Sequence, residues 1–177
     1  EKVITHHFEV YDLDDYINPI KAGYSASMAD TMARYKAGEP IFFYTWAPNW
    51  TIGMLKPGED VMWINVPEIN PLESQMAGKD RMTVSGIAGA VTDPLKAGFV
   101  VSDIQVVANK EFLEANPAAK KFFEVFTLPL SDINTQNTKM ENGEKSQQDI
   151  ERHAQEWIAA NKEKWNGWLE EAKAAAK

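Results

Sequence analysis

The sequence predicts an α/β fold with mainly parallel sheets and helices on both faces. Residues 41–46 form a continuous β-prone apolar run, as expected for a strand buried on both faces, and the largely apolar segments 61–66 and 100–108 are predicted to be two further strands. Stretches with the helical spacing of apolar residues precede the first run and follow the last. Strands that alternate with helices favour a parallel sheet, because each parallel connection needs a crossover that is usually a helix.

Two amphipathic helices are predicted before the first strand. The first covers residues 2–12, with an apolar face of Val3, Ile4, His7, Phe8 and Tyr11. An acidic turn at residues 12–15 ends it. The second covers residues 24–37, with an apolar stripe of Tyr24, Met28, Met32 and Tyr35. Gly38 and Pro40 then stop the second helix.

The stretch between the second and third predicted strands has no regular pattern. Residues 67–98 are rich in Pro, Gly and Lys, which is typical of irregular surface structure. We expect a connection between two lobes here. The predicted division assigns residues 1–66 to one lobe and residues 67–177 to the C-terminal part of the other, which ends in a Trp-rich helical segment.

The C-terminal part of the chain is predicted to be helical, with local signals at most helix starts. Asn109 is an N-cap residue, Pro117 lies in a first turn, and Ser131 opens a third helix. Ser146 and Asp149 have the spacing of a capping box, although Asp is a weaker partner there than Glu or Gln. We expect helices over residues 110–115, 117–126 and 131–140, and helical spacing from residue 147 to the end.

Composition excludes several classes of protein. The formal charge of −8, from 18 basic and 26 acidic residues, argues against a non-specific nucleic-acid binder. The chain has no cysteine, which excludes thiol catalysis, thiolate metal sites and disulfides. No uncharged apolar run approaches the ~18–20 residues that span a bilayer. Because Glu1 is not an initiator Met and no signal-peptide pattern precedes it, we expect a processed or truncated chain.

The spacing of the residues that could serve in catalysis or metal binding argues against both functions. His6 and His7 diverge by about 100° on a helix, so we expect one packed and one solvated histidine rather than a shared metal ion. The acidic turn at residues 12–15 lacks the Gly and Glu of an EF-hand loop. A hydrolase or transferase would need a base near its nucleophile, and no histidine lies beside a strand-end Ser or Thr. We expect no enzyme activity, no cofactor and no metal.

The tryptophans are the most informative side chains. Trp46 ends the first predicted strand, and ligands of open α/β sheets bind outside the carboxyl ends of the strands. Tyr44 and Trp50 lie nearby in sequence, and no Lys or Arg occurs between Lys36 and Lys56. This makes an aromatic surface suited to a cation. The alternative, that Trp46 closes the core, stays open at this point. Core or inter-helix roles are expected for Trp63, Trp157, Trp165 and Trp168.

Several segments carry a family resemblance. The strongest are YSASMADT at residues 24–31 and RYKAGEPIFFYTWAPNW at residues 34–50. Weaker ones are LKPGEDVMW (55–63), VVANK (106–110), NPAA (116–119) and INTQN (133–137). Together they closely resemble the glycine betaine/proline betaine-binding proteins of bacterial ABC importers. The resemblance covers nearly the whole chain, but only the C-terminal part of the family's length.

The resemblance implies the C-terminal part of a two-lobed periplasmic-binding-protein fold of type II, with residues 1–66 in the ligand lobe. Members of this family hold the trimethylammonium group of the ligand in a box of tryptophans. Trp46 matches one wall of that box, and Tyr44, Pro48 and Trp50 are weaker ligand-binding candidates. The resemblance places the other walls before Glu1.

The implied function is a solute-binding receptor of an osmoprotectant importer. Its partners would be a small quaternary ammonium ligand and the permease subunits. Its location would be the periplasm, or outside the membrane with a tether in a Gram-positive host. Two alternatives remain: a binder of choline or another quaternary amine, and a non-catalytic interaction module that exposes Trp165 or Trp168. We also expect self-association of this chain, because apolar strand surface would face solvent.

Overall fold

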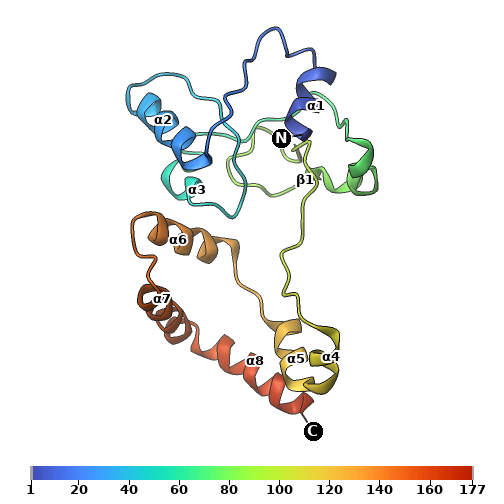
Figure 1. Cartoon of the computed structure of the whole chain (residues 1–177), viewed down its shortest axis with the longest axis vertical. Helices are drawn as coiled ribbons and strands as arrows, with labels where there is room; N and C mark the ends of the chain where they lie inside the picture. Colours follow the sequence, from blue (N-terminus) through green and yellow to red (C-terminus); the bar gives the residue numbers. More distant parts are fainter. Residues whose placement is uncertain (1, 177) are drawn as a thin grey trace. The chain divides into compact units, whose positions relative to one another are not determined.

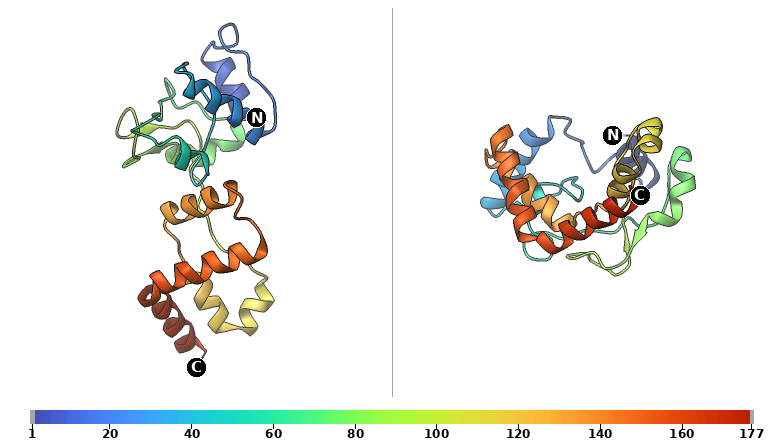
Figure 2. Two further views of the ribbon diagram at one scale, coloured as in Figure 1. Left: turned by 90° about the vertical axis from the view of Figure 1, so that its left-hand side faces the viewer. Right: turned by 90° about the horizontal axis from the view of Figure 1, so that it is seen from below.

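The computed structural model describes residues 2–176, which form two compact units (Figures 1 and 2). Unit 1 consists of residues 2–46 and 54–102, and unit 2 of residues 47–53 and 103–176. The chain therefore passes between the units three times. The assignment of residues 1–66 and 67–177 to the two lobes of a complete binding protein stays a prediction.

Unit 1 contains two α-helices where the sequence predicted them. They are α1 (Lys2–Val10) and α2 (Tyr24–Lys36), each slightly shorter than expected. Gly38, with φ of +75°, follows α2 in the left-handed conformation that glycine adopts without strain. The acidic turn after α1 is exposed, as expected. A 3₁₀ helix, η1 (Glu73–Arg81), lies in the stretch that was expected to be irregular.

The predicted mainly parallel sheet is not found among residues 2–176. Regular pairing there is limited to two short antiparallel strands, β1 (Thr83–Val84) and β2 (Leu95–Lys96). In their register, Thr83 lies opposite Lys96 and Val84 opposite Leu95. The predicted strands at 41–46, 61–66 and 100–108 are therefore wrong for this structure, and the strands that form lie in the stretch expected to be irregular.

These runs do not form a sheet because, within the described chain, no neighbouring strand pairs with their backbones along their length. Residues 61–66 form only isolated pairings: Trp63 N–H donates to Gly89 O at 2.8 Å, and Val91 N–H donates to Trp63 O at 2.9 Å. A strand buried on both faces needs hydrogen-bonded neighbours along its edges. The other two runs form no ladder within the described chain, and several of their apolar side chains are exposed. The exposed fractions are 70% for Phe42, 68% for Ile104 and 93% for Val107.

Unit 2 is helical. Its helices are α3 (Thr51–Met54, which ends at the return to unit 1), α4 (Lys110–Ala115), α5 (Pro117–Val125), α6 (Leu130–Glu141), α7 (Gln147–Ala160) and α8 (Lys162–Ala175). The start signals predicted at Asn109, Pro117 and Ser146 are confirmed, whereas α6 begins at Leu130, one residue before the predicted start at Ser131. The Asn109 side chain accepts from Phe112 N–H at 2.9 Å, and Pro117 is the first residue of α5. Ser146 and Asp149 form the full capping box.

The helical run after residue 147 is two helices, separated at Asn161. Asn161 has φ of −115° and ψ of 32°, outside the α-helical region, and its side-chain amide donates to Trp157 O at 2.9 Å. Asparagine favours helix ends because its amide competes for backbone hydrogen bonds. The bend separates α7 from α8 and lets α8 pack along α5 (Figure 1).

Aromatic rings form the core of unit 2. Phe122 of α5 meets Trp165 of α8 edge to face at a centroid distance of 5.6 Å, and Phe126, which directly follows α5, meets Trp168 edge to face at 5.2 Å. Trp157 stacks on Trp168 at 5.9 Å with an interplanar angle of 11°. Trp168 is only 6% exposed and Trp165 is half-buried. The expected core role of these tryptophans is confirmed, and the exposure required by the interaction-module alternative is not found.

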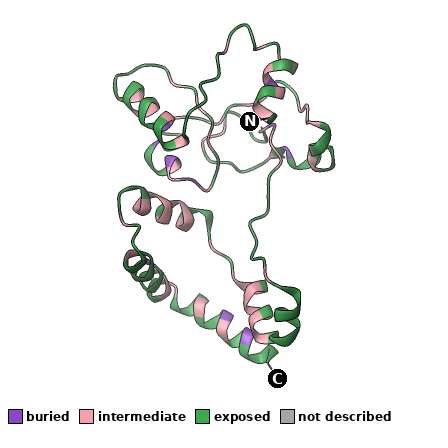
Figure 3. Ribbon diagram, in the orientation of Figure 1, coloured by how far each residue is buried: buried purple, intermediate pink, exposed green. Residues whose placement is uncertain are grey.

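The core of unit 1 is small. Its buried apolar side chains are Met28, Leu55, Met82 and Leu95. Most of the ribbon is exposed or half-buried (Figure 3). None of the helices within residues 2–176 has the length and apolar character needed to cross a membrane.

Candidate ligand-binding site

Trp46 is the last residue of unit 1 before the chain enters unit 2. Its side chain is 44% exposed, which makes it the most exposed of the six tryptophans. The following Ala47–Pro48 peptide bond is cis. An indole with this exposure can meet a ligand, and the exposure argues against the alternative in which Trp46 closes the core.

Two tyrosines contact Trp46 within unit 1. The ring of Tyr24, at the start of α2, lies 4.8 Å from the indole centroid with an interplanar angle of 44°. The ring of Tyr44 lies 5.8 Å from it, tilted by 36°. Tyr44 was a sequence-predicted candidate. Tyr24 was missed, because its helical spacing placed it in the apolar stripe of α2 and no periodicity connects it to a residue 22 positions later.

The ring contacts continue away from Trp46. Tyr44 contacts Phe99 at 5.4 Å, and Phe99 meets His7 edge to face at 5.2 Å. Burial raises the pKa of the Tyr44 hydroxyl, and the nearby Tyr24 raises it further. Tyr44 therefore stays neutral at physiological pH. We call the five rings of Tyr24, Trp46, Tyr44, Phe99 and His7 the aromatic row; it joins α1 to the exposed indole.

His7 is the buried end of the aromatic row. Burial lowers the pKa of its imidazole, the neighbouring His6 lowers it further, and a hydrogen bond with the Gly98 backbone opposes both. His6 Nε2 lies 3.0 Å from Asn70 O. The prediction of one packed histidine is confirmed, whereas the prediction of one solvated histidine is wrong. Residues 2–176 hold no group of three side chains placed to bind a metal ion.

Comparison with known proteins identifies the family of the chain. Residues 1–160 match the family described as the substrate binding domain of ABC-type glycine betaine transport systems. The chain belongs to this family. Membership implies a periplasmic-binding-protein fold, of which residues 2–176 show a helix-rich part with few strands.

Named relatives support the same family. The chain is 44% identical to the glycine betaine-binding periplasmic protein OusX of Dickeya dadantii. It is 41% identical to the glycine betaine/proline betaine-binding periplasmic protein of Escherichia coli, and 39% identical to the protein of that name in Salmonella typhimurium. Each alignment covers all 177 residues of this chain and 51% of the relative. The chain thus spans about half the length of the curated relatives it matches.

The other two predicted ligand-binding residues are Pro48 and Trp50, which belong to unit 2 and are half-buried. Between them lies Asn49, which is buried; its backbone N–H donates to Asn134 Oδ1 of α6 at 3.0 Å. The Asn49 side chain in turn accepts from Thr51 N–H at 3.1 Å. Of the four sequence-predicted residues, the structure therefore brings Trp46 and Tyr44 together in unit 1 and positions Pro48 and Trp50 beside an anchored asparagine in unit 2.

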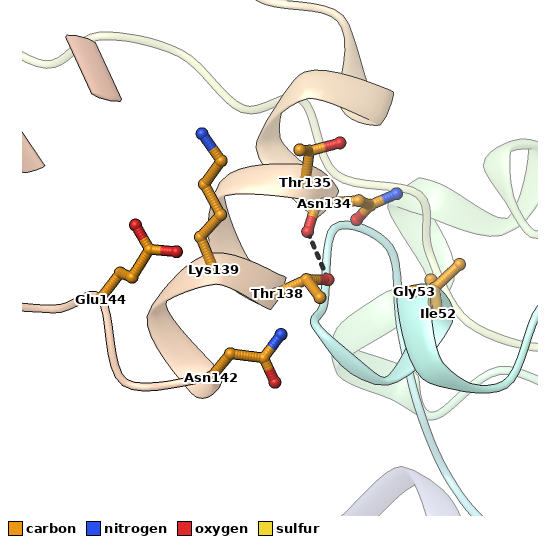
Figure 4. A pocket seen from close by; sticks show the side chains of 8 residues that line it. All are labelled: Ile52, Gly53, Asn134, Thr135, Thr138, Lys139, Asn142 and Glu144. Atoms are coloured by element: carbon orange, nitrogen blue, oxygen red, sulfur yellow. Dashed lines mark hydrogen bonds between the residues drawn. The ribbon is translucent and has the colours of Figure 1, made fainter. Parts of the chain in front are cut away.

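Unit 2 also has a polar cavity of about 340 Å³ between α3 and α6 (Figure 4). It is lined by Ile52, Gly53, Asn134, Thr135, Thr138, Lys139, Asn142 and Glu144. Its two charged groups are already paired: Lys139 Nζ lies 3.5 Å from Glu156, and Glu144 lies 2.6 Å from Arg152. No aromatic ring lines the cavity, so its chemistry does not suit a quaternary ammonium, in contrast to the surface at Trp46.

Proposed function

We propose that this chain is the C-terminal part of a solute-binding receptor for glycine betaine or proline betaine in an ABC importer, and that Trp46 is one wall of its ligand box. The observation that carries the proposal is the exposed indole of Trp46, in contact with two tyrosines, in a chain of the glycine betaine family. The relatives' names state glycine betaine, or glycine betaine and proline betaine, as what they bind.

The chemistry of the ligand explains why an aromatic wall is suited to it. A quaternary ammonium has no N–H to donate, so hydrogen bonds cannot hold it. The face of a tryptophan attracts it through the ring quadrupole, with about 0.5–2 kcal/mol for each contact. Tyr44 is a second, weaker candidate because its exposed ring is next to Trp46. Pro48 and Trp50 are further, weaker candidates, because they follow Trp46 in the segment with the strongest family resemblance.

The receptor would be non-catalytic and would deliver its ligand to membrane permease subunits. Its location would be the periplasm, or the outer side of the membrane with a tether in a Gram-positive host. These proposals follow from the importer family and from the periplasmic relatives. Choline is the alternative ligand, because it carries the same trimethylammonium group without the carboxylate.

The test compares two proteins by calorimetry with glycine betaine, proline betaine and choline. The first is this chain alone. The second has the relatives' full length and carries residues 1–177 as its C-terminal half. We expect the second to bind betaines with micromolar or better affinity and the first to bind feebly, because one aromatic wall contributes too little. Tight binding of choline alone would select the alternative ligand, and absence of binding to all three would refute the proposed function.

We also propose that the isolated chain self-associates. Phe42, Ile104 and Val107 are exposed apolar residues in segments without ladder partners. Exposed apolar patches and unpaired extended segments favour pairing with another chain. Sedimentation velocity over a range of concentrations should show a rising mass, whereas a monomer with a cooperative melt would contradict this.

A further inference from the structure

Tyr24 is the first residue of α2, and it packs against Trp46 with its ring while its hydroxyl bonds the residue before the tryptophan. We propose that Tyr24 is a positioning residue, which holds the indole of Trp46 in the orientation that receives a quaternary ammonium. The inference rests on the proposed role of Trp46, and it adds a residue that neither the sequence patterns nor the family resemblance assigned to the site.

The ring contact shows that Tyr24 packs directly against the indole. A separation of 4.8 Å lies near the short end of the 4.5–7 Å range for contacting aromatic rings. A bound cation lies within about 6 Å of a ring centroid and needs space of its own over the ring face. Two ring centroids 4.8 Å apart leave no room for a trimethylammonium group between them. Tyr24 therefore supports the indole and is not an opposing wall.

The hydroxyl of Tyr24 fixes the backbone that carries Trp46. It donates to Thr45 Oγ1 at 2.9 Å, across 21 residues of sequence. Residues 41–46 belong to no strand in the described chain, so no ladder of backbone hydrogen bonds holds this segment. The bond to Thr45 connects it to the start of a 13-residue helix. This restrains the backbone directly beside Trp46, on which the orientation of the indole depends.

The variant Tyr24→Phe tests the hydroxyl, because it keeps the ring and removes the bond. The same helix offers a matched control: Tyr35, whose hydroxyl donates to Asp60 Oδ1 at 2.6 Å. Tyr35→Phe also loses one tyrosine hydrogen bond on α2. The first readout is the indole N–H resonance of Trp46 in the chain itself, assigned by its absence in Trp46→Phe. The second is calorimetric affinity for glycine betaine in the full-length form. Thermal melts accompany both.

Tyr24→Phe should move or broaden the Trp46 resonance and weaken affinity about three- to tenfold, as expected for the loss of one hydrogen bond. Thr45→Val should reproduce both effects, because it removes the acceptor. Tyr35→Phe should leave the resonance and the affinity unchanged while changing the melting temperature by a similar amount. An unchanged Trp46 resonance and unchanged affinity in both Tyr24→Phe and Thr45→Val would overturn the inference.

The outcomes also separate this inference from the proposed function. If the wild-type full-length form bound no betaine, the proposed function would fail, while the Trp46 resonance would still report whether Tyr24 orients the indole. If the wild type bound betaine and Tyr24→Phe matched it in both readouts, only the positioning role would fail. Tyr24→Ala removes ring and hydroxyl together and should weaken binding more than Tyr24→Phe.

Discussion

Replacing Trp46 by alanine separates a ligand-binding role from a core role. In the structure the indole is 44% exposed and makes two ring contacts, with Tyr24 and Tyr44. Aromatic pairs contribute about 0.5–1.5 kcal/mol each beyond their burial of apolar area, so the two ring contacts alone account for about 1–3 kcal/mol of unfolding free energy. Because the exposed part of the indole loses no burial, the total loss should stay below that of a fully buried tryptophan. A tryptophan that closes the core would cost about 3–5 kcal/mol.

The expected loss of affinity comes from the missing aromatic face. One cation–π contact of about 0.5–2 kcal/mol corresponds to a two- to thirtyfold increase in Kd. Because the proposed box would desolvate its ligand, we expect the upper end of this range, which removes most of the affinity. Trp46→Phe keeps a weaker ring face and should lie between the wild type and Trp46→Ala.

The assay is a pair of measurements on the full-length form: calorimetric titration with glycine betaine and thermal unfolding. Trp168→Ala is the control, because Trp168 is 6% exposed in the core of unit 2. It should show the larger loss of stability that is expected for a buried tryptophan. Unchanged affinity of Trp46→Ala would remove Trp46 from the site, and a stability loss matching that of Trp168→Ala would favour the core role.

Three further predictions concern the scaffold. Gly53→Ala would place a Cβ against Thr138 Oγ1, closer than van der Waals contact, and should lower the free energy of unfolding in urea by about 1–3 kcal/mol. Thr138→Ala should restore most of this loss, and full stability of the single variant would contradict the close approach. Ser146→Ala removes the acceptor of the α7 capping box and should lower stability by about 1 kcal/mol, whereas Ser146→Thr should not. Burial lowers the pKa of His7 in the folded state below the 6.5 of the unfolded chain, so the unfolded chain binds more protons between these two pKa values. The free energy of unfolding should therefore fall as the pH decreases from about 6.5 through the folded-state pKa of His7. Melts at a series of pH values should show this decline in the wild type and not in His7→Gln.

The features that the sequence predicted well are those set by neighbouring residues. The helix starts at Asn109, Pro117 and Ser146 follow from hydrogen bonds or backbone angles within three or four positions, which are visible in the sequence. The strands were predicted from composition alone, and composition does not show whether partners exist. The run at 61–66 makes only isolated pairings, with residues near 57, 90 and 96, so the β-prone sequence did not produce a sheet.

The candidate site could likewise be predicted only where neighbouring residues determine it. Trp46 could be identified because it ends an apolar run and lies in the most specific segment of the family resemblance. Tyr24 could not, since its contact with Trp46 depends on how α2 packs within unit 1. The break at Asn161 was also missed, because the apolar spacing continues on both sides of it and only the amide bond to Trp157 O marks the change.

Residues 47–53 belong to unit 2 but lie in the sequence between the two segments of unit 1, so neither unit is encoded by one uninterrupted stretch of gene. A fragment starting at residue 103 would contain α4 to α8 but lack Asn49 and Thr51, which are buried in the intact unit and connect to Asn134 of α6. Expression of that fragment would leave the Asn134 amide without its backbone donor. Any transplant of the helical unit onto another scaffold must carry two separate segments, and a protease that cut only at residue 102 would leave seven residues of unit 2 attached to unit 1.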